Sequence, residues 1–374
     1  MGKTVCLNMI VRDESPVIRR CLASLKHLID YWVIVDTGSS DGTQTIIRDF
    51  LNEIPGVLYE RPWVNFGHNR NEALNLAKDK GDYLLFIDAD EFLVFENDFT
   101  FPELTADVYF VLTRADLESF YRQLFVSTQI DWLWNGALHE TLSSSQIKNG
   151  MVLLGITNVV THEGHRSQDP NKYLKDSLLL EEMLADDPTN ERILFYLAIT
   201  YADAQNYELA LKTFEKRAAM GGDPEQKFYS LLSIALLQDA MNLGSELFMR
   251  SYDQAFQFRP TRAEPLYYMA RYYMSIQAYL LGYLLSQHAL TIPRPCDQGN
   301  VKISIYDYEL LVQFAEASFA LGRIEEACNT YQQLIWKFES YLKTNHLSCE
   351  CQERMKSVLP GMRQFLRENS PSKI

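Results

Sequence analysis

The chain has 374 residues, 47% of them hydrophobic, which is typical of a globular protein long enough for two domains. Its 49 acidic and 35 basic side chains give a net charge of −14, which argues against non-specific nucleic-acid binding because such binding needs a basic surface. No apolar run reaches the roughly 18 residues of a membrane span, no signal-peptide pattern occurs and the six cysteines are scattered, so we expect a cytoplasmic protein without a span.

Up to about residue 160, short apolar runs alternate with segments of helical spacing. The strand-like runs occupy residues 5–11, 31–36, 56–62 and 82–88, and the helix-like segments between them occupy residues 15–28, 42–54 and 67–80. In the first helix-like segment we expect Ser15 as the N-cap, with Pro16 at the first helical position. Two later runs, at residues 108–114 and 120–126, predict paired strands. Strands that alternate with helices predict a mostly parallel α/β sheet with helices on both faces.

From about residue 171 the pattern is helical, and it repeats. One unit carries the large and small residues of a tetratricopeptide repeat at Leu194, Leu197, Ala198, Tyr201, Ala210 and Phe214. Later units include Tyr229, Leu266 and Leu311, and the second and third follow the family period of about 34 residues. The first two units are a few residues out of phase, and the segment 219–224 would absorb that offset. An ordinary helical bundle is the alternative interpretation.

Carboxylates follow three of the predicted strands. In open α/β sheets, ligands bind outside the carboxyl ends of the strands. The first strand is followed by "RDE" (residues 12–14), the second by "DTGSSDGT" (36–43) and the fourth by "DADE" (88–91). A divalent cation would relieve the repulsion among these carboxylates, because Mg²⁺ and Mn²⁺ prefer oxygen ligands and often share their shell with substrate phosphates. A solvated acidic turn is the alternative for any one of these motifs alone.

The loop after the second predicted strand also excludes two nucleotide-binding classes. "DTGSSDGT" is neither a Walker A sequence nor a Gly-x-Gly-x-x-Gly motif, so P-loop NTPases and classical dehydrogenases are excluded. It is either a nucleotide-facing loop or a plain turn in which Ser40 or Asp41 caps the next helix.

The first half of the chain contains four motifs in a fixed order, "CLNMIVRDE", "VDTGSSDGT", "NRNEAL" and "DYLLFIDADE". Together they resemble the nucleotide-sugar-binding half of family 2 glycosyltransferases with the GT-A fold. The later "GALHE" and "VVTHEGH", followed by helical repeats, resemble the bacterial-type subgroup with a tetratricopeptide C-terminus. The resemblance implies a GT-A domain over residues 1–170 and a tetratricopeptide-like helical repeat domain over residues 171–374.

The resemblance implies a role for each motif. Asp90 corresponds to a metal ligand, Asp88 to a residue near the ribose and the metal, and Asp36 to a carboxylate that contacts the base or the ribose. His162 corresponds to a histidine that completes the metal site in metal-dependent relatives, and a surface or satisfied core histidine is the alternative. The other donor-binding residues that it implies are Val11, Arg12 and Glu14, along the same pocket, and Arg70, near the diphosphate or base.

The resemblance also implies the chemistry. The catalytic base of the family is a carboxylate that ends a short acidic motif, and Glu140 falls there with His139 in place of the more usual acid. The expected activity is that of a metal-dependent, inverting hexosyltransferase, with Mn²⁺ or Mg²⁺, that moves a sugar from a nucleotide-diphosphate donor, a UDP-sugar being favoured. The expected acceptor is a protein, peptide or glycan. Glu91 stays open between a supporting group and an acceptor-side group.

Two other functions fit parts of the sequence. One is a non-catalytic tetratricopeptide scaffold with a degenerate transferase domain, and the other is a nucleotidyltransferase. The repeats could hold a protein acceptor. They could also form a homo-oligomer, which we expect, through Tyr267, Tyr268, Tyr272 and Tyr273, unless these tyrosines only pack between helices.

Overall fold

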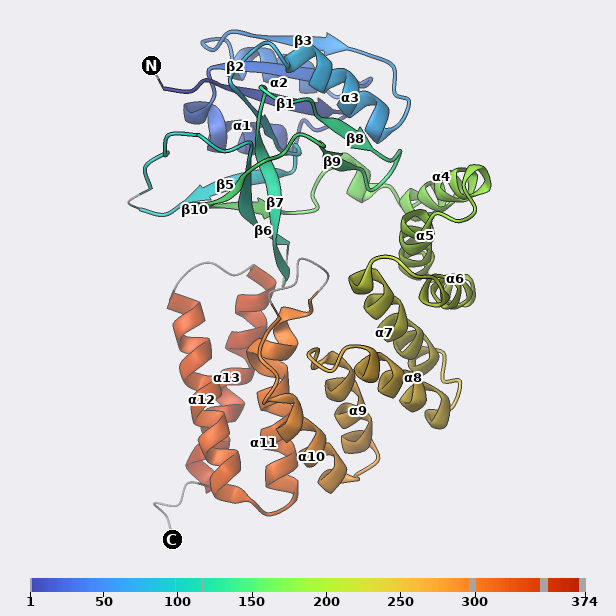
Figure 1. The fold of residues 1–374 in the computed structure, drawn as a ribbon. Coiled ribbons are helices and arrows are strands. Elements are labelled where there is room, and N and C mark those ends of the chain that lie inside the picture. Colours follow the sequence, from blue (N-terminus) through green and yellow to red (C-terminus); the bar gives the residue numbers. More distant parts are fainter. Residues whose placement is uncertain (1, 98, 116–117, 296–300, 344–348, 370–374) are drawn as a thin grey trace. The chain divides into compact units, whose positions relative to one another are not determined.

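The structure is a computed structural model that describes residues 2–97, 99–115, 118–295, 301–343 and 349–369 (Figure 1). It divides into two compact units. The first contains Met1–Ala115 and Ser119–Leu179, and the second contains Asp116–Glu118 and Leu180–Ile374. Within the described residues, no helix combines the length and the apolar character needed to cross a lipid bilayer.

The first unit is built on a mixed sheet, which has eight strands within the described residues. In spatial order these are β3 (Gly56–Glu60), β2 (Tyr31–Asp36), β1 (Val5–Val11), β4 (Tyr83–Phe86), β7 (Glu118–Ser127), β6 (Val108–Ala115), β10 (Gly150–Val160) and β5 (Glu91–Phe95). Strands β3, β2, β1 and β4 run parallel, as do β6 and β10, whereas β7 is antiparallel to β4 and β5 to β10. The prediction of a mostly parallel first half with a later pair of strands is confirmed.

Helices cover both faces of this sheet because both faces are apolar. Alternate residues of β1, such as Leu7 and Met9, pack with α1 (Ile18–Leu25) and α2 (Thr43–Phe50). On the other face, Cys6 packs with α3 (Phe66–Ala77). The 3-10 turn η1 (Lys26–Leu28) follows α1, and a hairpin of β8 (Leu133–Asn135) and β9 (Thr141–Ser143) lies outside the main sheet. Burial on both faces explains why β1, β2 and β4 read as nearly continuous apolar runs.

The capping predicted for the first helix is wrong. Helix α1 begins at Ile18, and the residue before it, Val17, makes no side-chain cap. Ser15 lies in the preceding turn, where its backbone N–H donates to Asp41 Oδ2 at 2.8 Å. The loop after β1 is therefore tied to the loop after β2, which outweighs the local capping preference of serine.

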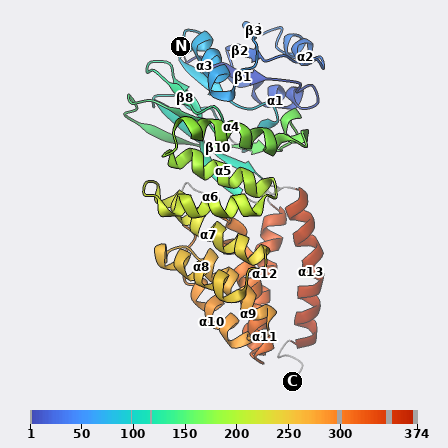
Figure 2. The same cartoon turned by 90° about the vertical axis from the view of Figure 1, so that its right-hand side faces the viewer.

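The second unit is helical. The 3-10 turn η2 (His165–Gln168) precedes α4 (Lys172–Asp186), which crosses the boundary between the units. The helices that follow are α5 (Glu191–Asp203), α6 (Tyr207–Ala219), α7 (Pro224–Ala240), α8 (Ser245–Phe258), α9 (Glu264–Ser275), α10 (Tyr279–Ala289), α11 (Leu310–Ala320), α12 (Ile324–Lys343) and α13 (Cys349–Asn369). A π-helical segment, η3 (Ile305–Glu309), leads into α11. Successive helices α5 to α8 form hairpins (Figure 2).

The turn inside each helix pair contains, near its start, a residue in the left-handed conformation. The turns of α5–α6, α7–α8, α9–α10 and α11–α12 have such a residue at φ of 59°, 54°, 62° and 74°, namely Gln205, Asn242, Gln277 and Gly322, and the α7–α8 turn adds Gly244 at 104°. In each turn the next N–H donates to a carbonyl five residues earlier, as Asn206 does to Tyr201 at 2.8 Å, which closes a Schellman motif. From positions 205, 242, 277 and 322, the turns are 37, 35 and 45 residues apart. The tetratricopeptide-like repeat and its offset after the first unit are confirmed.

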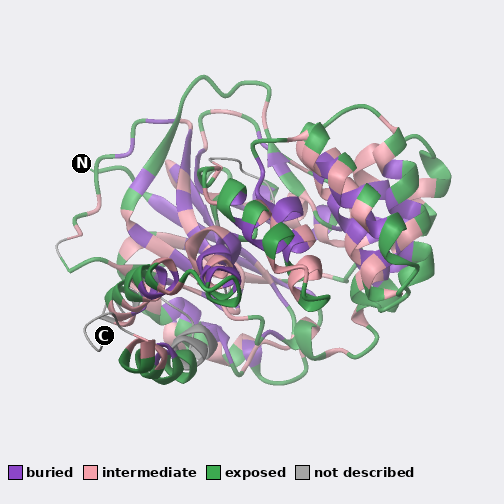
Figure 3. Ribbon diagram, turned by 90° about the horizontal axis from the view of Figure 1, so that it is seen from below, coloured by how far each residue is buried: buried purple, intermediate pink, exposed green. Residues whose placement is uncertain are grey.

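The small residues of the repeat pattern are fully buried where the helices meet (Figure 3). Ala198, Ala210 and Ala315 have no exposed surface, so each lets a neighbouring helix approach closely. The tyrosines expected at an interface pack inward. Tyr268 is stacked on Tyr252 with the ring centroids 5.6 Å apart, and Tyr267 and Tyr272 pack against the same cluster. Tyr267, Tyr268 and Tyr272 therefore pack between helices, and Tyr273 is half-buried with its ring centroid 5.7 Å from that of Tyr272.

Candidate active site

The loops after β1 and β2 form one hydrogen-bonded rim. Val11 at the end of β1 lies in register with Asp36 at the end of β2, so the two loops start side by side. Asp13 N–H donates to Ser39 Oγ at 2.8 Å, and Glu14 N–H donates to Thr43 Oγ1 at 2.8 Å. These bonds use the short polar side chains of "DTGSSDGT" as fixed acceptors, which explains why this loop holds one shape.

Asp36 presents an unpaired carboxylate oxygen. The residue is 1% exposed, and its Oδ1 accepts hydrogen bonds from Gly38 N–H at 3.0 Å, Ser39 N–H at 2.9 Å and Gln44 Nε2 at 3.1 Å. Its Oδ2 is buried and has no partner in the part of the chain that the structure describes. A buried oxygen without a donor is costly, so this position suits a ligand hydroxyl or N–H.

Arg70 links two of the predicted site carboxylates. Its NH2 group donates to Asp88 Oδ1 at 2.6 Å and its Nε donates to Glu140 Oε1 at 2.5 Å, and its side chain is 12% exposed. The guanidinium also lies 5.0 Å from the ring centroid of Trp134. Burial alone would lower the pKa of Arg70, but the attraction of Asp88 and Glu140 reverses this and raises it. The structure therefore brings Asp88 and Glu140 together through one buried cation.

Asp88 is held by arginines on two sides. Arg122 NH1 lies 3.9 Å from Asp88 Oδ2, opposite the contact with Arg70. Burial raises the pKa of the Asp88 carboxyl, but Arg70 and then Arg122 outweigh it, so that the pKa lies below its usual value. Asp88 therefore stays ionised near neutral pH.

Glu91 is a supporting group behind Asp88. It is 2% exposed and forms a two-pronged ion pair with Arg122, in which NH1 and Oε1 are 2.6 Å apart. Its Oε2 also accepts from Asp88 N–H at 3.2 Å and from Asn158 Nδ2 at 3.1 Å. Burial raises the pKa of Glu91 despite the neighbouring guanidinium. These contacts hold the backbone of the "DADE" segment in place from its buried side.

Arg122 and Asn158 were not predicted from the sequence. Both interrupt apolar strands, "FYRQLFV" in β7 and "GITNVV" in β10. A charged or amide side chain at such a position needs a buried partner. That signal could have indicated a buried polar partner, although it would not have identified Glu91 as that partner.

Asp90 and Glu14 converge from different strand ends. Gly164 N–H donates to Asp90 Oδ2 at 3.3 Å, and a Cβ at Gly164 would lie 3.1 Å from that oxygen and 3.2 Å from Glu14 Oε2. Because Gly164 has no side chain, a space (the Gly164 cradle) remains beside Asp90 Oδ2 and Glu14 Oε2. Both are hard oxygen donors, the kind that Mg²⁺ and Mn²⁺ prefer. Burial raises the pKa of Glu14 to about 7, and the charges of Asp90 and Asp88 add to this.

The predicted third ligand, His162, is not joined to Asp90 by a direct contact. Its neighbour Thr161 donates to the Asp90 carbonyl at 2.7 Å, while His162 itself is exposed. Among the residues that the structure describes, no three histidine, cysteine, aspartate or glutamate side chains form a ready metal site. The structure thus places Asp90 beside Glu14, with His162 on the adjoining loop.

Val11 and Arg12, the remaining residues predicted to bind the sugar donor, differ in which of their groups a ligand could reach. Val11 is 3% exposed, and its carbonyl already accepts from Thr37 N–H at 2.9 Å, so it shapes the floor of the rim. Arg12 has a side chain that is 52% exposed and lies 3.9 Å from Asp13, so its guanidinium is accessible to an anion.

Three of the six described non-glycine residues with positive φ lie in these loops, and the other three lie in turns of the helical unit. Asp13, His139 and His162 have φ values of 54°, 52° and 54°, a conformation that residues other than glycine seldom adopt. Asp13 and His139 lie next to the predicted site residues Glu14 and Glu140, and His162 is itself a predicted site residue. Strain of this kind is characteristic of functional sites.

Residues 6–97 match the model of glycosyl transferase family 2. These residues are a family 2 glycosyltransferase domain. The match includes Glu14, Asp36, Arg70, Asp88 and Asp90 but stops before Glu140 and His162. Glu140 is joined to the domain by its contact with Arg70.

Two curated proteins resemble the chain over longer stretches. A TPR repeat-containing protein of Synechococcus elongatus is 28% identical over 257 residues, which are 63% of this chain and 61% of that protein. The SPbeta prophage-derived glycosyltransferase SunS of Bacillus subtilis is 26% identical over 208 residues, or 52% of this chain and 48% of SunS. The chain thus spans about half to three fifths of the length of these relatives.

Solved structures of tetratricopeptide proteins also resemble the chain. A thermophilic TPR protein of Thermus thermophilus, TTC0263, has a TM-score of 0.35 and 16% identity, with 50% of this chain and 91% of that one covered. The repeat character of the helical unit rests on its own turns and buried alanines.

Proposed function

We propose that the glycosyltransferase domain transfers a sugar from a nucleoside-diphosphate donor, with UDP-sugars favoured, to a protein or glycan acceptor with inversion. The observation that carries this proposal is the chain of contacts Asp88–Arg70–Glu140, which joins the family's acidic motif to a carboxylate outside the matched segment. A single displacement needs a positioned donor and a base beside the acceptor, and this linked group would hold both in a fixed geometry.

The donor would lie along the rim at the ends of β1, β2 and β4. The unpaired Oδ2 of Asp36 would accept a hydrogen bond from the ribose or the base, which removes the cost of leaving it buried and unpaired. The exposed guanidinium of Arg12 would approach the diphosphate. Arg70, by contrast, has its Nε and NH2 groups engaged by carboxylates, which favours a positioning role.

The Gly164 cradle is an argument for a divalent cation at this position. Asp90 would hold the ion, with Glu14 beside it and His162 on the adjoining loop. Such an ion supplies charge neutralisation for the leaving diphosphate when it is bound. The two arginines beside Asp88 keep that carboxylate ionised and fixed in direction.

Glu140 would act as the general base. It removes the proton from the acceptor as the acceptor atom forms a bond to the anomeric carbon, and the bond from that carbon to the diphosphate oxygen breaks. The nucleoside diphosphate leaves with the electron pair of the broken bond. A single displacement inverts the configuration and needs no covalent enzyme intermediate. Cys6 and Cys21 are both buried, consistent with a structural role for these thiols.

A donor screen tests this proposal. The melting temperature of the full chain is measured with UDP- and GDP-sugars, with UTP, and with each of these plus Mn²⁺. We expect stabilisation by one class of nucleotide-sugar with Mn²⁺, since a ligand at about 100 times its Kd adds about 2.7 kcal/mol. Release of the nucleoside diphosphate is then followed with that donor. Absence of both effects would favour a non-catalytic scaffold, and preference for UTP would favour a nucleotidyltransferase.

A further inference from the structure

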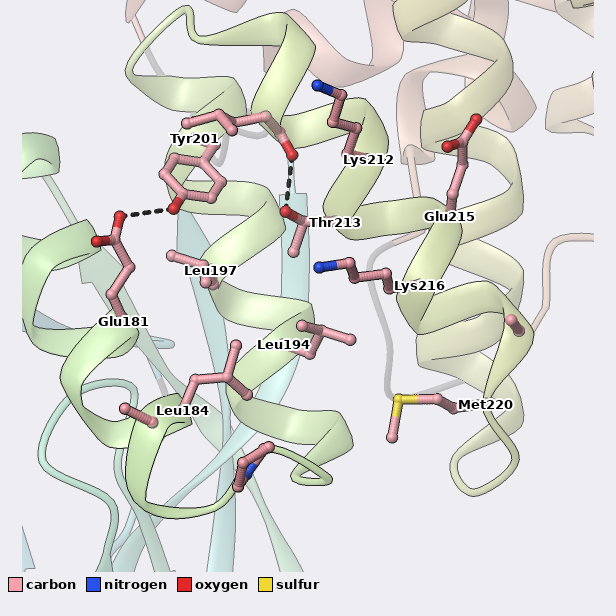
Figure 4. A pocket seen from close by; sticks show the side chains of 14 residues that line it. Glu181, Leu184, Leu194, Leu197, Tyr201, Lys212, Thr213, Glu215, Lys216 and Met220 are labelled. Carbon is pink, nitrogen blue, oxygen red and sulfur yellow. Dashed lines mark hydrogen bonds between the residues drawn. The ribbon is translucent and has the colours of Figure 1, made fainter.

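A hollow in the second unit does not select a ligand. It lies among α4, α5 and α6, has a volume of about 1070 Å³ and is drawn in Figure 4. Two glutamates and two lysines line it, together with Leu194 and Leu197, which are already buried. Neither its charge nor its apolar surface favours one kind of partner. The first unit has a more informative feature, which is the way it holds the loop that contains Glu140.

Glu140 lies in a loop whose support comes from outside its own hairpin. Residues 136–140 connect β8 to β9, and these two short strands form a two-stranded sheet of their own. A hairpin of two strands is only marginally stable by itself in water. Trp132 and Leu142 anchor this one in the apolar cluster that includes Leu74 and Phe86. Apolar contacts are not directional, so they do not by themselves fix the position of the loop.

Asn71 of α3 holds the first strand of this hairpin through two opposed hydrogen bonds. Its Nδ2 donates to the carbonyl oxygen of Trp134 at 2.8 Å, and its Oδ1 accepts from the backbone N–H of Trp134 at 2.9 Å. The planar amide therefore pairs with β8 as a peptide group of a neighbouring strand would. Since the backbone of Trp134 engages both the amide nitrogen and the amide oxygen, Asn71 is suited to hold the strand.

The N-terminus of α3 supports the loop at two further points. The N–H of Phe66, the first residue of the helix, has no acceptor within the helix and donates to the carbonyl of Ala137 at 3.1 Å. A Cβ at Gly67 would lie 2.1 Å from the carbonyl oxygen of Gly136. Only a residue without a side chain leaves room for this approach, so the sequence at position 67 lets the loop pack directly on the helix.

One face of α3 thus holds the whole loop (Figure 1). The residues on this face are Phe66, Gly67, Arg70 and Asn71, which recur at the interval of one helical turn. Arg70 donates to Glu140 Oε1 at 2.5 Å, and its guanidinium lies 5.0 Å from the ring centroid of Trp134. The helix therefore fixes the segment at both ends, at Trp134 through Asn71 and at Glu140 through Arg70.

We propose that Asn71 is a positioning residue for the transfer reaction, because by fixing β8 at Trp134 it sets where Glu140 stands. The proposal rests on the proposed function, since it assigns Asn71 to the general base and not to the sugar donor. Arg70 orients the carboxylate itself, whereas Asn71 holds the strand from which the loop begins. Loss of the amide would let the hairpin shift, and a shift of about 1 Å at a catalytic group can cost about 100-fold in rate.

The test compares Asn71→Ala, which removes both hydrogen bonds, with Asn75→Ala, an exposed asparagine one turn further along α3. Hydrogen–deuterium exchange of the full chain, followed by mass spectrometry, is the measurement that needs no activity. We expect residues 133–143 to exchange at least about tenfold faster in Asn71→Ala than in the wild type or the control. Circular dichroism checks the fold of each variant.

Steady-state kinetics with the donor found in the screen is the second measurement. Asn71→Ala should lower kcat by about 10- to 100-fold and change the donor Kd, measured by calorimetry, by less than about twofold. In a Glu140→Gln background it should lower kcat no further, since the base that Asn71 positions is absent. Asn71→Asp, which keeps the shape of the side chain but sets an oxygen against the carbonyl of Trp134, repeats the test if Asn71→Ala does not fold.

Three results would overturn the proposal. A loss of donor affinity at unchanged kcat would make Asn71 a ligand of the donor. An equal fall in kcat with and without Glu140→Gln would show a general structural role. Unchanged exchange of residues 133–143 would show that the hairpin is held without Asn71. Full activity of Glu140→Gln alone would instead refute the proposed base, and the exchange measurement would still decide whether Asn71 anchors the hairpin.

Discussion

Arg70 Nε lies 2.5 Å from Glu140 Oε1, and the same guanidinium reaches Asp88 Oδ1 at 2.6 Å. One buried cation thus fixes the distance between the carboxylate of the acidic motif and the proposed base. Arginine is suited to this task because its planar fork donates to two carboxylates in fixed directions, which a single ammonium group cannot do.

Replacing Arg70 with lysine should lower kcat about 100-fold and change the KM for the donor by less than threefold. The charge is kept, but Glu140 loses its orientation, and small displacements of catalytic groups cost about this much. The measurement is steady-state kinetics with the donor found in the screen. A large rise in donor KM with an unchanged kcat would instead make Arg70 a donor ligand.

Glu140→Gln should keep donor binding and lower the rate of transfer by about 10² to 10⁴. The amide oxygen can still accept from Arg70, so the local geometry is retained while the proton acceptor is lost. Donor binding is measured by calorimetry and transfer by mass spectrometry of the acceptor. Glu53→Gln, an exposed position that pairs with Lys26 in the same unit, is the matched control. Near-wild-type transfer by Glu140→Gln would place the base elsewhere.

The sheet and its acidic edge could be predicted because both follow from local patterns. Apolar runs such as that of β1 have a single interpretation when helices alternate with them, and the carboxyl ends of parallel strands meet at one edge. The placement of Asp36 and Asp88 at that edge follows directly. The helix pairs could be predicted for the same reason, from the spacing of small residues such as Ala198 and Ala210.

The partners of these residues could not be predicted. The contact between Arg70 and Glu140 joins positions 70 residues apart, and that between Glu91 and Asn158 joins positions 67 apart. Sequence patterns do not specify which buried charges pair over such separations. The N-cap prediction for Ser15 failed in a similar way, because its turn is bonded to Asp41 of the next loop.

Removing the carboxylate of Asp90 should weaken Mn²⁺ binding more than tenfold. Asp90 Oδ2 faces the cradle at Gly164, and an amide is a much poorer ligand for a hard cation. The measurement is the electron paramagnetic resonance signal of free Mn²⁺ during titration of Asp90→Asn, without donor and without an activity assay. His162→Ala is tested in parallel, and weaker Mn²⁺ binding by that variant would assign His162 as a metal ligand. Unchanged Mn²⁺ binding by Asp90→Asn would contradict the metal assignment.

Removing Arg122 from the Glu91–Arg122 pair should destabilise the first unit by about 3–5 kcal/mol, because the carboxylate of Glu91 is then buried without its main partner, whereas in Glu91→Gln the guanidinium of Arg122 still faces Asp88. The variants are Glu91→Gln, Arg122→Met and the combination of both. Since the pair is coupled, the double variant should lose less stability than the sum of the two single variants. Urea unfolding is the measurement, and strict additivity would show that the pair contributes nothing beyond its separate side chains.

Asp41 should protect the first unit against acid. Its side chain is partly desolvated, which raises the pKa, but hydrogen bonds from Thr43 and Ser15 outweigh this and lower the pKa from 3.8 to about 2. Because the folded state holds the ionised form more strongly, the stabilisation is present above about pH 4 and is lost as the pH falls toward 2. Asp41→Asn should therefore lose about 1 kcal/mol at pH 7, as removal of a helix-start acceptor does, and almost nothing near pH 2.

Urea unfolding followed by tryptophan fluorescence measures this difference, because four of the five tryptophans, at positions 32, 63, 132 and 134, lie in the first unit. The wild type and Asp41→Asn are compared at pH 7, 4 and 2.5, so that other carboxylates titrate equally in both proteins. Asp49→Asn, at an exposed position on the helix α2 that follows this loop, is the matched control for the removal of a carboxylate. A difference for Asp41→Asn that stays constant from pH 7 to pH 2.5 would mean that the charge of Asp41 does not contribute, and that the hydrogen bonds to Thr43 and Ser15 stabilise the loop equally well from a neutral side chain.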